Sequence, residues 1–389
     1  GSEYDPRRLV TTNDIIVVTI NYRLGPLGFL MGDGLTGDYG FQDQIAALRW
    51  VQANIGAFGG AADQVTIQGE SAGGSAVCAL LTAPAASGLF SRAVIQSASC
   101  ESLPLATAQS GAPILAQKLA CSSSPAACAK DTAFTAKELV SASEQLGFVY
   151  GAVAGSGVLP LGPFDAITLG QLTKVPVLIG DITDEMSFFM ALDSKLLNSL
   201  WGGYPQVLLD WFPNVDTNAI ATEYPLTRYG NQPFFALAAA LNDSGVYYGQ
   251  ALGGCVTAKA AAALSAATTT YSYELNDPGF TWANNSRGAS HTTDLPYLFD
   301  LQYPLSQPLN ATQSSLAQTM VENWGSFITS GSPSQGWPLH SSTGSGAGTT
   351  RYFEPGVGQK FIDLRVQHHC AFWDELCGVQ RERCPYPKR

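Results

Sequence analysis

The sequence is poor in charge, and the charge it carries is mostly negative. Only 13% of its 389 residues are charged, and the formal net charge is −11. This balance argues against nucleic acid or an anionic membrane as the main partner. No apolar run reaches the length of a membrane span, so no transmembrane segment is expected. Hydrophobic residues, at 46%, suffice for the core of one large domain or two average ones.

The sequence also lacks a signal peptide, and Gly1-Ser2-Glu3-Tyr4-Asp5 does not resemble a natural start, which predicts a mature, cleaved or trimmed product. Eight cysteines are many for a cytosolic protein and favour an oxidising compartment. Three glycosylation sequons point the same way, and together these features predict a secreted protein or one in the secretory-pathway lumen. The sequons begin at Asn242, Asn284 and Asn310.

The segment Gly69-Glu70-Ser71-Ala72-Gly73 follows an alternating, strand-like stretch at 64–68 and precedes a small, apolar stretch at 74–81 typical of a buried helix. A strand, a Gly-x-Ser-x-Gly turn and a helix form a nucleophile elbow, which exposes its serine on a strained bend. We expect both glycines to be needed because a side chain would clash where strand and helix meet. The pattern therefore predicts Ser71 as a nucleophile.

Strand-like and helix-like segments alternate along much of the chain, which predicts an α/β fold with a mostly parallel sheet. The run Ile15–Ile20 is continuously apolar and β-branched, as in a strand buried on both faces. Further strands are expected at 93–96, 175–180, 269–275, 351–353 and 360–364, and helices at 39–55, 312–328 and 368–376.

No internal repeat or linker divides the chain, so residues 1–389 are expected to form a single domain with cap-like insertions near 103–149 and 185–265. The second insertion is expected to be mostly helical and rich in aromatic residues. These aromatics either line a gorge or belong to an ordinary core; they are Phe188, Phe189, Trp201, Tyr204, Trp211, Phe212, Phe234 and Phe235.

A serine hydroxyl needs a base to take its proton and a third group to orient that base. The chain has four histidines. Of these, His291 lies in a polar loop downstream of the 269–275 strand, where α/β hydrolases carry their base. His340 lies in a low-complexity loop, and His368 and His369 open the terminal helix. The context favours His291.

The acid should follow the 175–180 strand. Asp181, Asp184 and Glu185 all lie there, and their spacing does not distinguish them. Solvated carboxylates at the start of a helix would give the same pattern, because the helix dipole favours negative charge at that end.

Nearly the whole chain resembles the type-B carboxylesterases, the cholinesterase-like branch of the α/β hydrolases. The resemblance is carried by a series of motifs in one order. They are Asn21 to Phe29, Asp38 to Gly60, Gly69 to Gly74, Asp184-Glu185-Met186-Ser187, His291 with Asp294-Leu295-Pro296-Tyr297, Asn323-Trp324 to Pro333, and Cys370-Ala371-Phe372-Trp373.

The resemblance implies roles for individual residues. It makes Ser71 the nucleophile, Glu185 the acid and His291 the base, and it makes the backbone N–H of Ala72 an oxyanion-hole donor. The family pattern also implies a Cys121–Cys128 small-loop disulfide and a long-range Cys255–Cys370 disulfide. We expect Cys377–Cys384 to form an extra clasp, Cys78 to be a buried free thiol, and Cys100 to be free or to reach a partner absent from this chain.

The sequence departs from the family pattern at two places. Met186 stands where family members commonly carry glycine. The His-Gly-Gly-Gly segment, which supplies the other oxyanion donors, should lie shortly before Gly1 together with amino-terminal strands of the sheet. Loss of one such donor costs about 10²–10³ in rate. We therefore expect a companion amino-terminal fragment, either a separate chain or a further segment of the precursor, held to this chain by packing and through Cys100.

The resemblance implies hydrolysis of a small-molecule or lipid carboxylic ester through an acyl-enzyme, with no metal or organic cofactor. The alternative is a non-catalytic adhesion or scaffold component of an extracellular assembly, since the family includes members that lost triad residues. All three triad residues are present here, which favours the enzyme. Choline esters, lipids and simple esters remain open as substrates.

Overall fold

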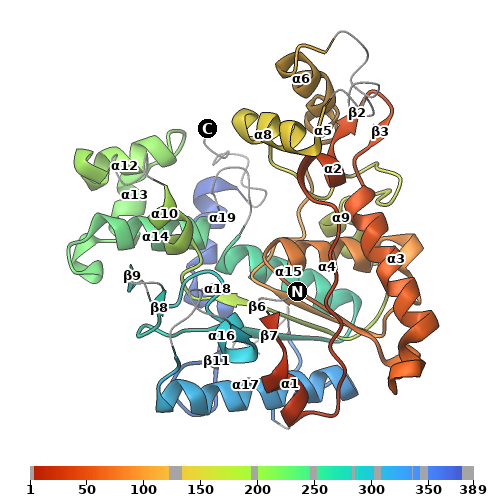
Figure 1. The fold of residues 1–389 in the computed structure, drawn as a ribbon. Coiled ribbons are helices and arrows are strands. Elements are labelled where there is room, and N and C mark those ends of the chain that lie inside the picture. Colours follow the sequence, from red (N-terminus) through yellow and green to blue (C-terminus); the bar gives the residue numbers. More distant parts are fainter. Residues whose placement is uncertain are drawn as a thin grey trace. The chain divides into compact units, whose positions relative to one another are not determined.

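The computed structural model describes residues 4–121, 134–193, 200–245, 252–282, 285–286, 288–301, 308–334, 336–341 and 349–378 (Figure 1). Contacts within the chain define two compact units. Unit 1 contains Val18–Val94 and Cys100–Val175, and unit 2 contains Ser2–Val17, Ile95–Ser99 and Pro176–Arg389. The strand β5 (Arg92–Gln96) crosses the boundary, with its last two residues in unit 2.

Unit 1 contains the elbow segment and the first helical insertion. Its helix α3 (Tyr39–Asn54) buries Phe41, Ile45, Leu48 and Val51, whose spacing places them on one face and confirms the predicted helix. The elements of unit 1, apart from α3 and β5, are α2 (Gly25–Phe29), β2 (Met31–Gly32), β3 (Leu35–Thr36), η1 (Ile55–Phe58), η2 (Ala62–Gln64), β4 (Thr66–Glu70), α4 (Ala72–Thr82), η3 (Pro84–Ala86), α5 (Leu105–Gln109), α6 (Gly111–Lys118), α8 (Ala136–Leu146) and α9 (Pro163–Thr168).

The insertion near 103–149 has a small core of its own. Helices α6 and α8 pack together, and Ala112, Leu115 and Leu139 bury their side chains there with Leu30. A capping box starts α8: the Thr135 hydroxyl accepts from the Glu138 N–H, and the Glu138 carboxylate accepts from the Thr135 N–H. The predicted helical insertion is present in the described part of this segment.

Unit 2 is built on the strands β6 (Val177–Ile182), β7 (Thr270–Leu275), β11 (Thr350–Phe353) and β12 (Lys360–Ile362), in the order β12-β11-β7-β6. Strands β6 and β7 are parallel, with Val177 opposite Thr270 and Ile182 opposite Leu275. β11 is parallel to β7, and β12 is antiparallel to β11. The Ser97 N–H donates to the Gly180 carbonyl at 2.8 Å, so the segment after β5 continues beside β6. The predicted mostly parallel sheet is confirmed.

The two faces of β7 contact different helices, because side chains alternate along a strand. Tyr273 packs edge-on against Trp324 of α17 (Ala311–Ser330), with ring centroids 4.9 Å apart. The next residue, Glu274, points the other way and meets His368, beyond α18 (Leu364–Gln367). Helix α15 (Gly254–Ala267) also packs on β6 and β7 (Figure 1).

The helices between residues 186 and 267 and those between 364 and 377 surround a large aromatic core of unit 2. Tyr204, Trp211, Phe212 and Phe234 are all buried in it, so for these four the core interpretation was the correct one. The remaining elements of unit 2 are β1 (Tyr4–Asp5), α1 (Arg7–Thr12), α10 (Met186–Leu192), η4 (Leu200–Gly202), α12 (Tyr204–Trp211), α13 (Thr217–Glu223), η5 (Leu226–Tyr229), α14 (Pro233–Ser244), β8 (Thr281–Trp282), β9 (Asn285–Ser286), α16 (Leu295–Leu298), β10 (Asp300–Leu301) and α19 (Cys370–Cys377).

The strand predicted at Ile15–Ile20 is wrong. The segment has no assigned strand partner within the described residues, and Ile16, Val18 and Ile20 are 47%, 43% and 40% exposed. β-Branched residues suit a strand that packs between neighbouring strands, but they do not ensure that such neighbours exist. Strand preference therefore depends on the packing around the segment.

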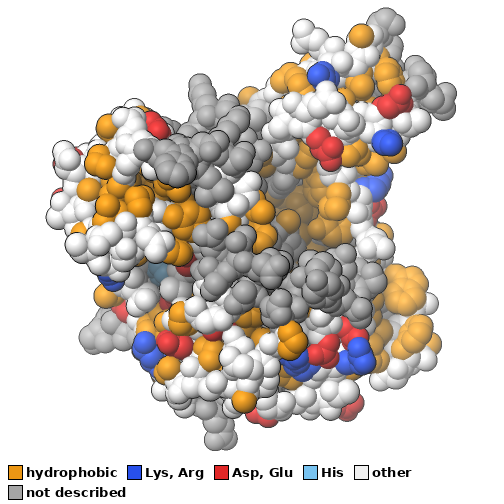
Figure 2. Space-filling model, turned by 60° about the vertical axis from the view of Figure 1, so that its left-hand side comes forward, with side chains coloured by type: hydrophobic (Ala, Val, Ile, Leu, Met, Phe, Trp, Pro, Cys, Tyr) orange, Lys and Arg blue, Asp and Glu red, His pale blue; other side chains and the backbone are white. Residues whose placement is uncertain are grey.

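Charged side chains are sparse on the surface, as the composition predicts. On the face shown in Figure 2, Lys and Arg side chains are scattered and interspersed with acidic ones. No helix in the described ranges is both long enough and apolar enough to cross a membrane.

Candidate active site

Ser71 lies in unit 1 between the end of β4 at Glu70 and the start of α4 at Ala72. Its backbone has φ 58° and ψ −122°, a conformation that non-glycine residues rarely adopt. Such strain persists only where the surroundings impose it, and it is the strained strand-to-helix turn expected of a nucleophile elbow. The local geometry around Ser71 therefore matches the sequence-based expectation.

The two glycines of the elbow differ in their surroundings. A Cβ added to Gly69 would lie 2.2 Å from the backbone carbon and oxygen of Gly73, so Gly69 is required for the close approach of strand and helix. A Cβ added to Gly73 would meet nothing within 4 Å. The expectation that both glycines prevent a clash is therefore correct for Gly69 and wrong for Gly73, whose neighbours leave open space.

Ala72 is the first residue of α4 and is exposed. The first four N–H groups of an α-helix have no acceptor within the helix, and the helix dipole makes this end partially positive. An N–H in this position suits an oxyanion, and the role of Ala72 as a donor stays a prediction.

Glu185 and His291 lie in unit 2: Glu185 is in the turn that follows β6, and His291 is in the longer loop after β7, beyond β8 and β9. Because these strands are adjacent and parallel, their carboxyl ends lie at one edge of the sheet. Oε2 of Glu185 is 2.5 Å from Nδ1 of His291, and the two side chains are 0% and 3% exposed. Oε1 of Glu185 accepts from the N–H of Ile182 at 2.9 Å. The carboxylate is thus held between the backbone of its own turn and the imidazole.

Of the three candidate acids, Glu185 is the one whose carboxylate contacts His291. Asp181 lies within β6, directly opposite Glu274 of β7. Asp184 accepts from the N–H of Ser187 at 3.2 Å, and burial raises the pKa of Asp184 to about 7. The geometry separates the three carboxylates, which spacing could not do.

Two aromatic side chains of α10 flank the imidazole. The Phe189 ring centroid lies 4.8 Å from that of His291, and the Phe188 centroid lies 5.9 Å away. Aromatic cover excludes water and lowers the local dielectric, which strengthens the attraction between Glu185 and a protonated imidazole. Phe188 and Phe189 are therefore the candidate gorge aromatics that lie beside the predicted base.

Asp294, three residues after His291, anchors the histidine turn. Its Oδ2 accepts from Nε2 of Gln96 at 2.6 Å and from the hydroxyl of Tyr273 at 2.9 Å. Burial raises the pKa of the Asp294 carboxyl, and the hydrogen bond from Gln96 opposes that shift. The sequence analysis gave Asp294 no role, although Asp294 belongs to the motif that carried the family resemblance.

The predicted triad is divided between the units. Ser71 belongs to unit 1, and Glu185 and His291 belong to unit 2. Within unit 2 the structure brings the predicted acid and base into direct contact. The assignment of catalytic roles to all three residues stays a prediction.

Two disulfides lie within the described residues. Cys255–Cys370, predicted from the family resemblance, is confirmed with a Cα–Cα distance of 5.5 Å. Cys78 is bonded to Cys100, so the expectation of a free Cys78 thiol is wrong, and Cys100 is not free. Because Cys100 is used within the chain, the structure gives no support to a companion fragment held through it. The predicted pairs Cys121–Cys128 and Cys377–Cys384 each include a residue outside the described ranges.

The three sequon asparagines differ in where the structure places them. Asn242 is 1% exposed and its side chain is hydrogen-bonded inside unit 2, so the glycosylation predicted there is wrong for the folded chain. Asn310 is exposed at the start of α17 and stays a predicted site. Asn284 lies outside the described residues.

The described part of the chain holds no cluster of His, Cys, Asp and Glu suited to a metal ion.

Comparison with known proteins gives a consistent set of relatives. The para-nitrobenzyl esterase of Bacillus subtilis (strain 168) is 37% identical over 211 residues, which cover 50% of this chain. Esterase E4 of Myzus persicae is 31% identical over 375 residues, which cover 86% of this chain. The chain spans 43% and 66% of the lengths of these two relatives, respectively.

Solved structures agree with these relatives. The carboxylesterase EST55 of Geobacillus stearothermophilus matches with a TM-score of 0.78 and 27% identity, covering 95% of this chain and 78% of that chain. A thermophilic PNB esterase matches with a TM-score of 0.75 and 26% identity, covering 96% and 76%. The fold is thus the predicted α/β-hydrolase fold, with a mostly parallel sheet flanked by helices. The carboxylesterase family model matches residues 1–373, and the chain belongs to that family.

Proposed function

We propose that this chain hydrolyses carboxylic esters through an acyl-enzyme on Ser71, with His291 as base and Glu185 as acid. The observation that carries the proposal is the 2.5 Å contact between the Glu185 carboxylate and Nδ1 of His291, in a buried position beside the Phe189 ring. This contact favours the tautomer with its proton on Nδ1, in which Nε2 is the nitrogen that acts as the general base.

The reaction follows in two halves. His291 Nε2 takes the proton of the Ser71 hydroxyl while Oγ attacks the ester carbonyl carbon, and Glu185 stabilises the resulting imidazolium. The tetrahedral oxyanion accepts a hydrogen bond from the Ala72 N–H. Collapse expels the alcohol, which takes the proton from His291 and leaves the acyl group on Ser71. Water then attacks that acyl group with the same base, and the acid leaves.

The substrate class follows from the family and from the names of the relatives. One relative is named for a para-nitrobenzyl ester, and others are named simply as esterases or carboxylesterases. We extend this to a small-molecule or lipid ester for the present chain. The mechanism needs no metal or organic cofactor, because each proton transfer has a side chain to carry it.

We also propose that the protein functions in an oxidising compartment, either outside the cell or in the secretory lumen. Two intrachain disulfides and the exposed sequon at Asn310 support this placement. Trypsin digestion and mass spectrometry of protein from its native source would detect both disulfides and a glycan at Asn310. Reduced cysteines at these four positions would contradict the placement.

Covalent labelling tests the enzyme proposal directly. A fluorophosphonate should modify one residue of the wild-type protein, found by peptide mapping at Ser71, and Ser71→Ala should abolish both labelling and hydrolysis of p-nitrophenyl acetate. Matched thermal unfolding curves would show that the variant is folded. Absence of labelling in folded wild-type protein would instead favour the non-catalytic scaffold.

A further inference from the structure

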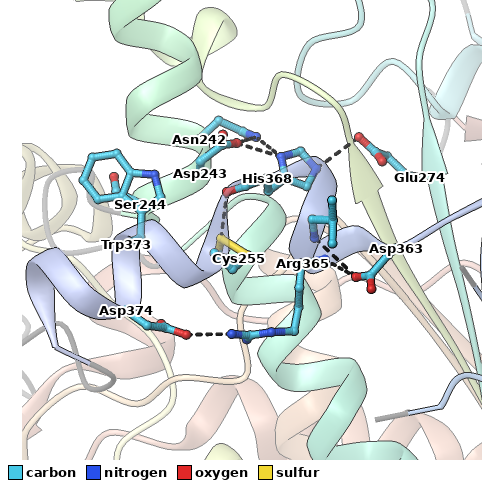
Figure 3. Close-up of a disulfide and its surroundings, with 12 residues drawn as sticks. Asn242, Asp243, Ser244, Cys255, Glu274, Asp363, Arg365, His368, Trp373 and Asp374 are labelled. Atoms are coloured by element: carbon cyan, nitrogen blue, oxygen red, sulfur yellow. Dashed lines mark hydrogen bonds and ion pairs between the residues drawn. A yellow bond between two sulfur atoms is a disulfide. The ribbon is translucent and has the colours of Figure 1, made fainter. Parts of the chain in front are cut away.

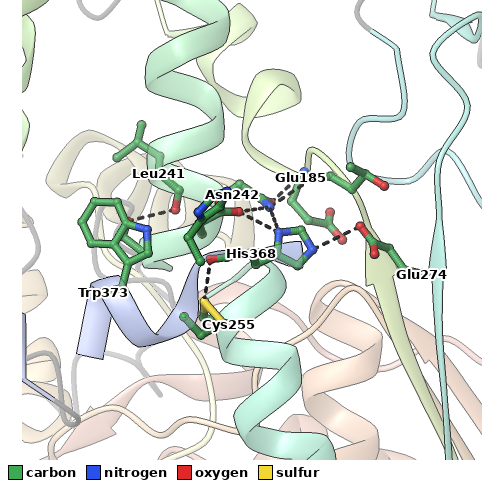
Figure 4. A network of polar contacts seen from close by, with 12 residues as sticks. Glu185, Leu241, Asn242, Cys255, Glu274, His368 and Trp373 are labelled. Atoms are coloured by element: carbon green, nitrogen blue, oxygen red, sulfur yellow. Dashed lines mark hydrogen bonds and ion pairs between the residues drawn. A yellow bond between two sulfur atoms is a disulfide. The ribbon is translucent and has the colours of Figure 1, made fainter. Parts of the chain in front are cut away.

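The side chain of Asn242 closes the turn that carries Glu185. Asn242 belongs to α14, far from this turn in the sequence, and is 1% exposed. Its Oδ1 accepts from the N–H of Glu185 at 3.0 Å, and its Nδ2 donates to the carbonyl of Thr183 at 3.1 Å. One amide therefore pairs with backbone groups on both sides of Asp184, and Figure 4 shows it beside Glu185.

His368 lies next to this amide and is held at both ring nitrogens. Nδ1 is 2.7 Å from Oδ1 of Asp243, and Nε2 is 3.1 Å from Oε1 of Glu274 (Figure 3). The same Oδ1 of Asp243 accepts from Nδ2 of Asn242 at 3.2 Å. Asp243 thus links the imidazole of His368 to the amide that holds the Glu185 turn.

The first turn of α15 is shaped to admit these groups. A Cβ on Gly254 would lie 2.1 Å from Cγ of the His368 ring, and a Cβ on Gly253 would lie 2.1 Å from the carbonyl oxygen of Asn242. The Cys255–Cys370 disulfide joins this turn to the segment just after His368. Two glycines and a disulfide therefore fix the imidazole against α14 and the sheet.

The charges around His368 favour its protonated form. Burial lowers the pKa of His368, but the carboxylates of Glu274 and Asp243 overcome this and raise it well above its usual value. Asp181 of β6 also faces this cluster, and burial together with the charge of Glu274 raises the pKa of Asp181. The protonated imidazole thus offsets the negative charge of the carboxylates on α14, β6 and β7, which are Asp243, Asp181 and Glu274.

We propose that Asn242 and His368 are positioning residues for the catalytic acid: His368 fixes Asp243 and Asn242, and Asn242 fixes the backbone at Glu185. This inference rests on the proposed function for its kinetic consequences. Its structural consequence is that these residues order the Glu185 turn, and this order can be measured without an activity assay. Asn242 contacts the backbone on both sides of Asp184, and His368 contacts Asp243, so each acts through the position of Glu185.

The effect should be seen mainly in turnover. A misplacement of about 1 Å in a catalytic group can lower the rate about 10²-fold. For Asn242→Ala and His368→Gln we expect kcat for p-nitrophenyl acetate to fall about 10- to 100-fold, with KM changed less than about 2-fold. The acid limb of the kcat/KM pH profile should move to lower pH, because a displaced Glu185 carboxylate stabilises protonated His291 less.

A double variant and a neighbouring histidine serve as controls. If His368 acts through Asn242, the double variant should lose no more activity than the single variant with the lower kcat. His369 is adjacent, pairs with Glu223 at 2.5 Å and has a left-handed backbone with φ 50°, which asparagine tolerates. His369→Asn should therefore keep the wild-type kcat and pH profile. Asn242→Ser, too short to reach both backbone groups, replaces Asn242→Ala if that variant does not fold.

Amide hydrogen exchange separates this inference from the proposed function. The Glu185 amide should exchange about 10-fold faster in Asn242→Ala and His368→Gln, but not in His369→Asn. Wild-type exchange at Glu185 in both variants, or additive losses of kcat in the double variant, would overturn the positioning role. If the wild-type protein neither hydrolyses the ester nor labels with fluorophosphonate, the proposed function fails while the exchange result still decides the role of Asn242.

Discussion

Nδ1 of His291 lies 2.5 Å from Oε2 of Glu185, and neither side chain is more than 3% exposed. The second carboxylate oxygen of Glu185 is held by the Ile182 N–H, so the carboxylate has little freedom to turn away. In a buried site, such a contact determines which nitrogen of the neutral imidazole carries the proton. The orientation of His291 is thus set by a residue 106 positions earlier in the chain.

Glu185→Gln should therefore lower kcat strongly while the protein stays folded. An amide can present its NH₂ to Nδ1 and stabilise the wrong tautomer, which in a serine triad costs about 10⁴ in kcat. We expect a loss of about 10³- to 10⁴-fold, with a smaller change in KM, measured with p-nitrophenyl acetate. Asp184→Asn changes the neighbouring carboxylate without touching His291 and should stay within about 3-fold of wild type. Equal activity in both variants would remove Glu185 from the triad.

The sequence predicted where an acid and a base would meet, but only the family resemblance selected Glu185 among the candidate acids. Adjacent parallel strands bring the ends of β6 and β7 together, so an acid after one and a histidine after the other are expected to be neighbours. Which acid turns inward depends on the backbone of the turn, and Asn242 of α14 holds that backbone. No local pattern around residue 185 contains this information.

The wrong predictions share the same physical cause. The sequon at Asn242 predicts an exposed glycosylation site, yet tertiary packing buries the Asn242 side chain. Cys78 and Cys100 gave no pairing signal, because a disulfide needs two Cα atoms within about 7 Å, which only the fold determines. Ile15–Ile20 has the composition of a buried strand but no assigned strand in the described residues. Local pattern predicts an element, and long-range contacts decide its environment.

The two glycines of the elbow should respond differently to alanine. Gly69→Ala forces a Cβ to within 2.2 Å of the Gly73 backbone and should cost about 3 kcal/mol of folding free energy. Gly73→Ala meets open space near the start of α4 and should be neutral or stabilising by about 0.5–1 kcal/mol. Urea unfolding followed by circular dichroism measures both. Equal destabilisation by the two substitutions would contradict the geometry of the elbow.

The two disulfides should contribute unequally to stability. Cys78–Cys100 spans 22 residues, and Cys255–Cys370 spans 115. In the chain-entropy model, the longer loop restricts the unfolded chain more, by about 1.5 kcal/mol. The double variant Cys255→Ala/Cys370→Ala should thus unfold at lower urea than Cys78→Ala/Cys100→Ala. The reverse order would show that packing around α4, where Cys78 is fully buried, outweighs the loop-length effect.

The stability of the protein should carry a pH-dependent contribution from Asp184. Burial raises the pKa of Asp184 from 3.8 to about 7, although hydrogen bonds from Ser187 oppose the shift. Between these values the folded chain holds a proton that the unfolded chain has released. The contribution of Asp184 to stability is therefore fully present below about pH 4 and is lost as the pH rises through about 7.

Asp184→Asn should remove this dependence, because the amide has no charge to bury. Relative to wild type, the variant should become more stable as the pH rises from 5 to 8, by about 1–3 kcal/mol in urea unfolding at pH 8. Glu138→Gln is the matched control of opposite sign. Hydrogen bonds from Thr135 lower the pKa of Glu138, so its stabilisation is present above the usual glutamate pKa and is lost only at lower pH. The difference between Glu138→Gln and wild type should thus stay constant from pH 5 to 8. A constant difference for Asp184→Asn over the same range would show that Asp184 is ionised in the folded protein at pH 5.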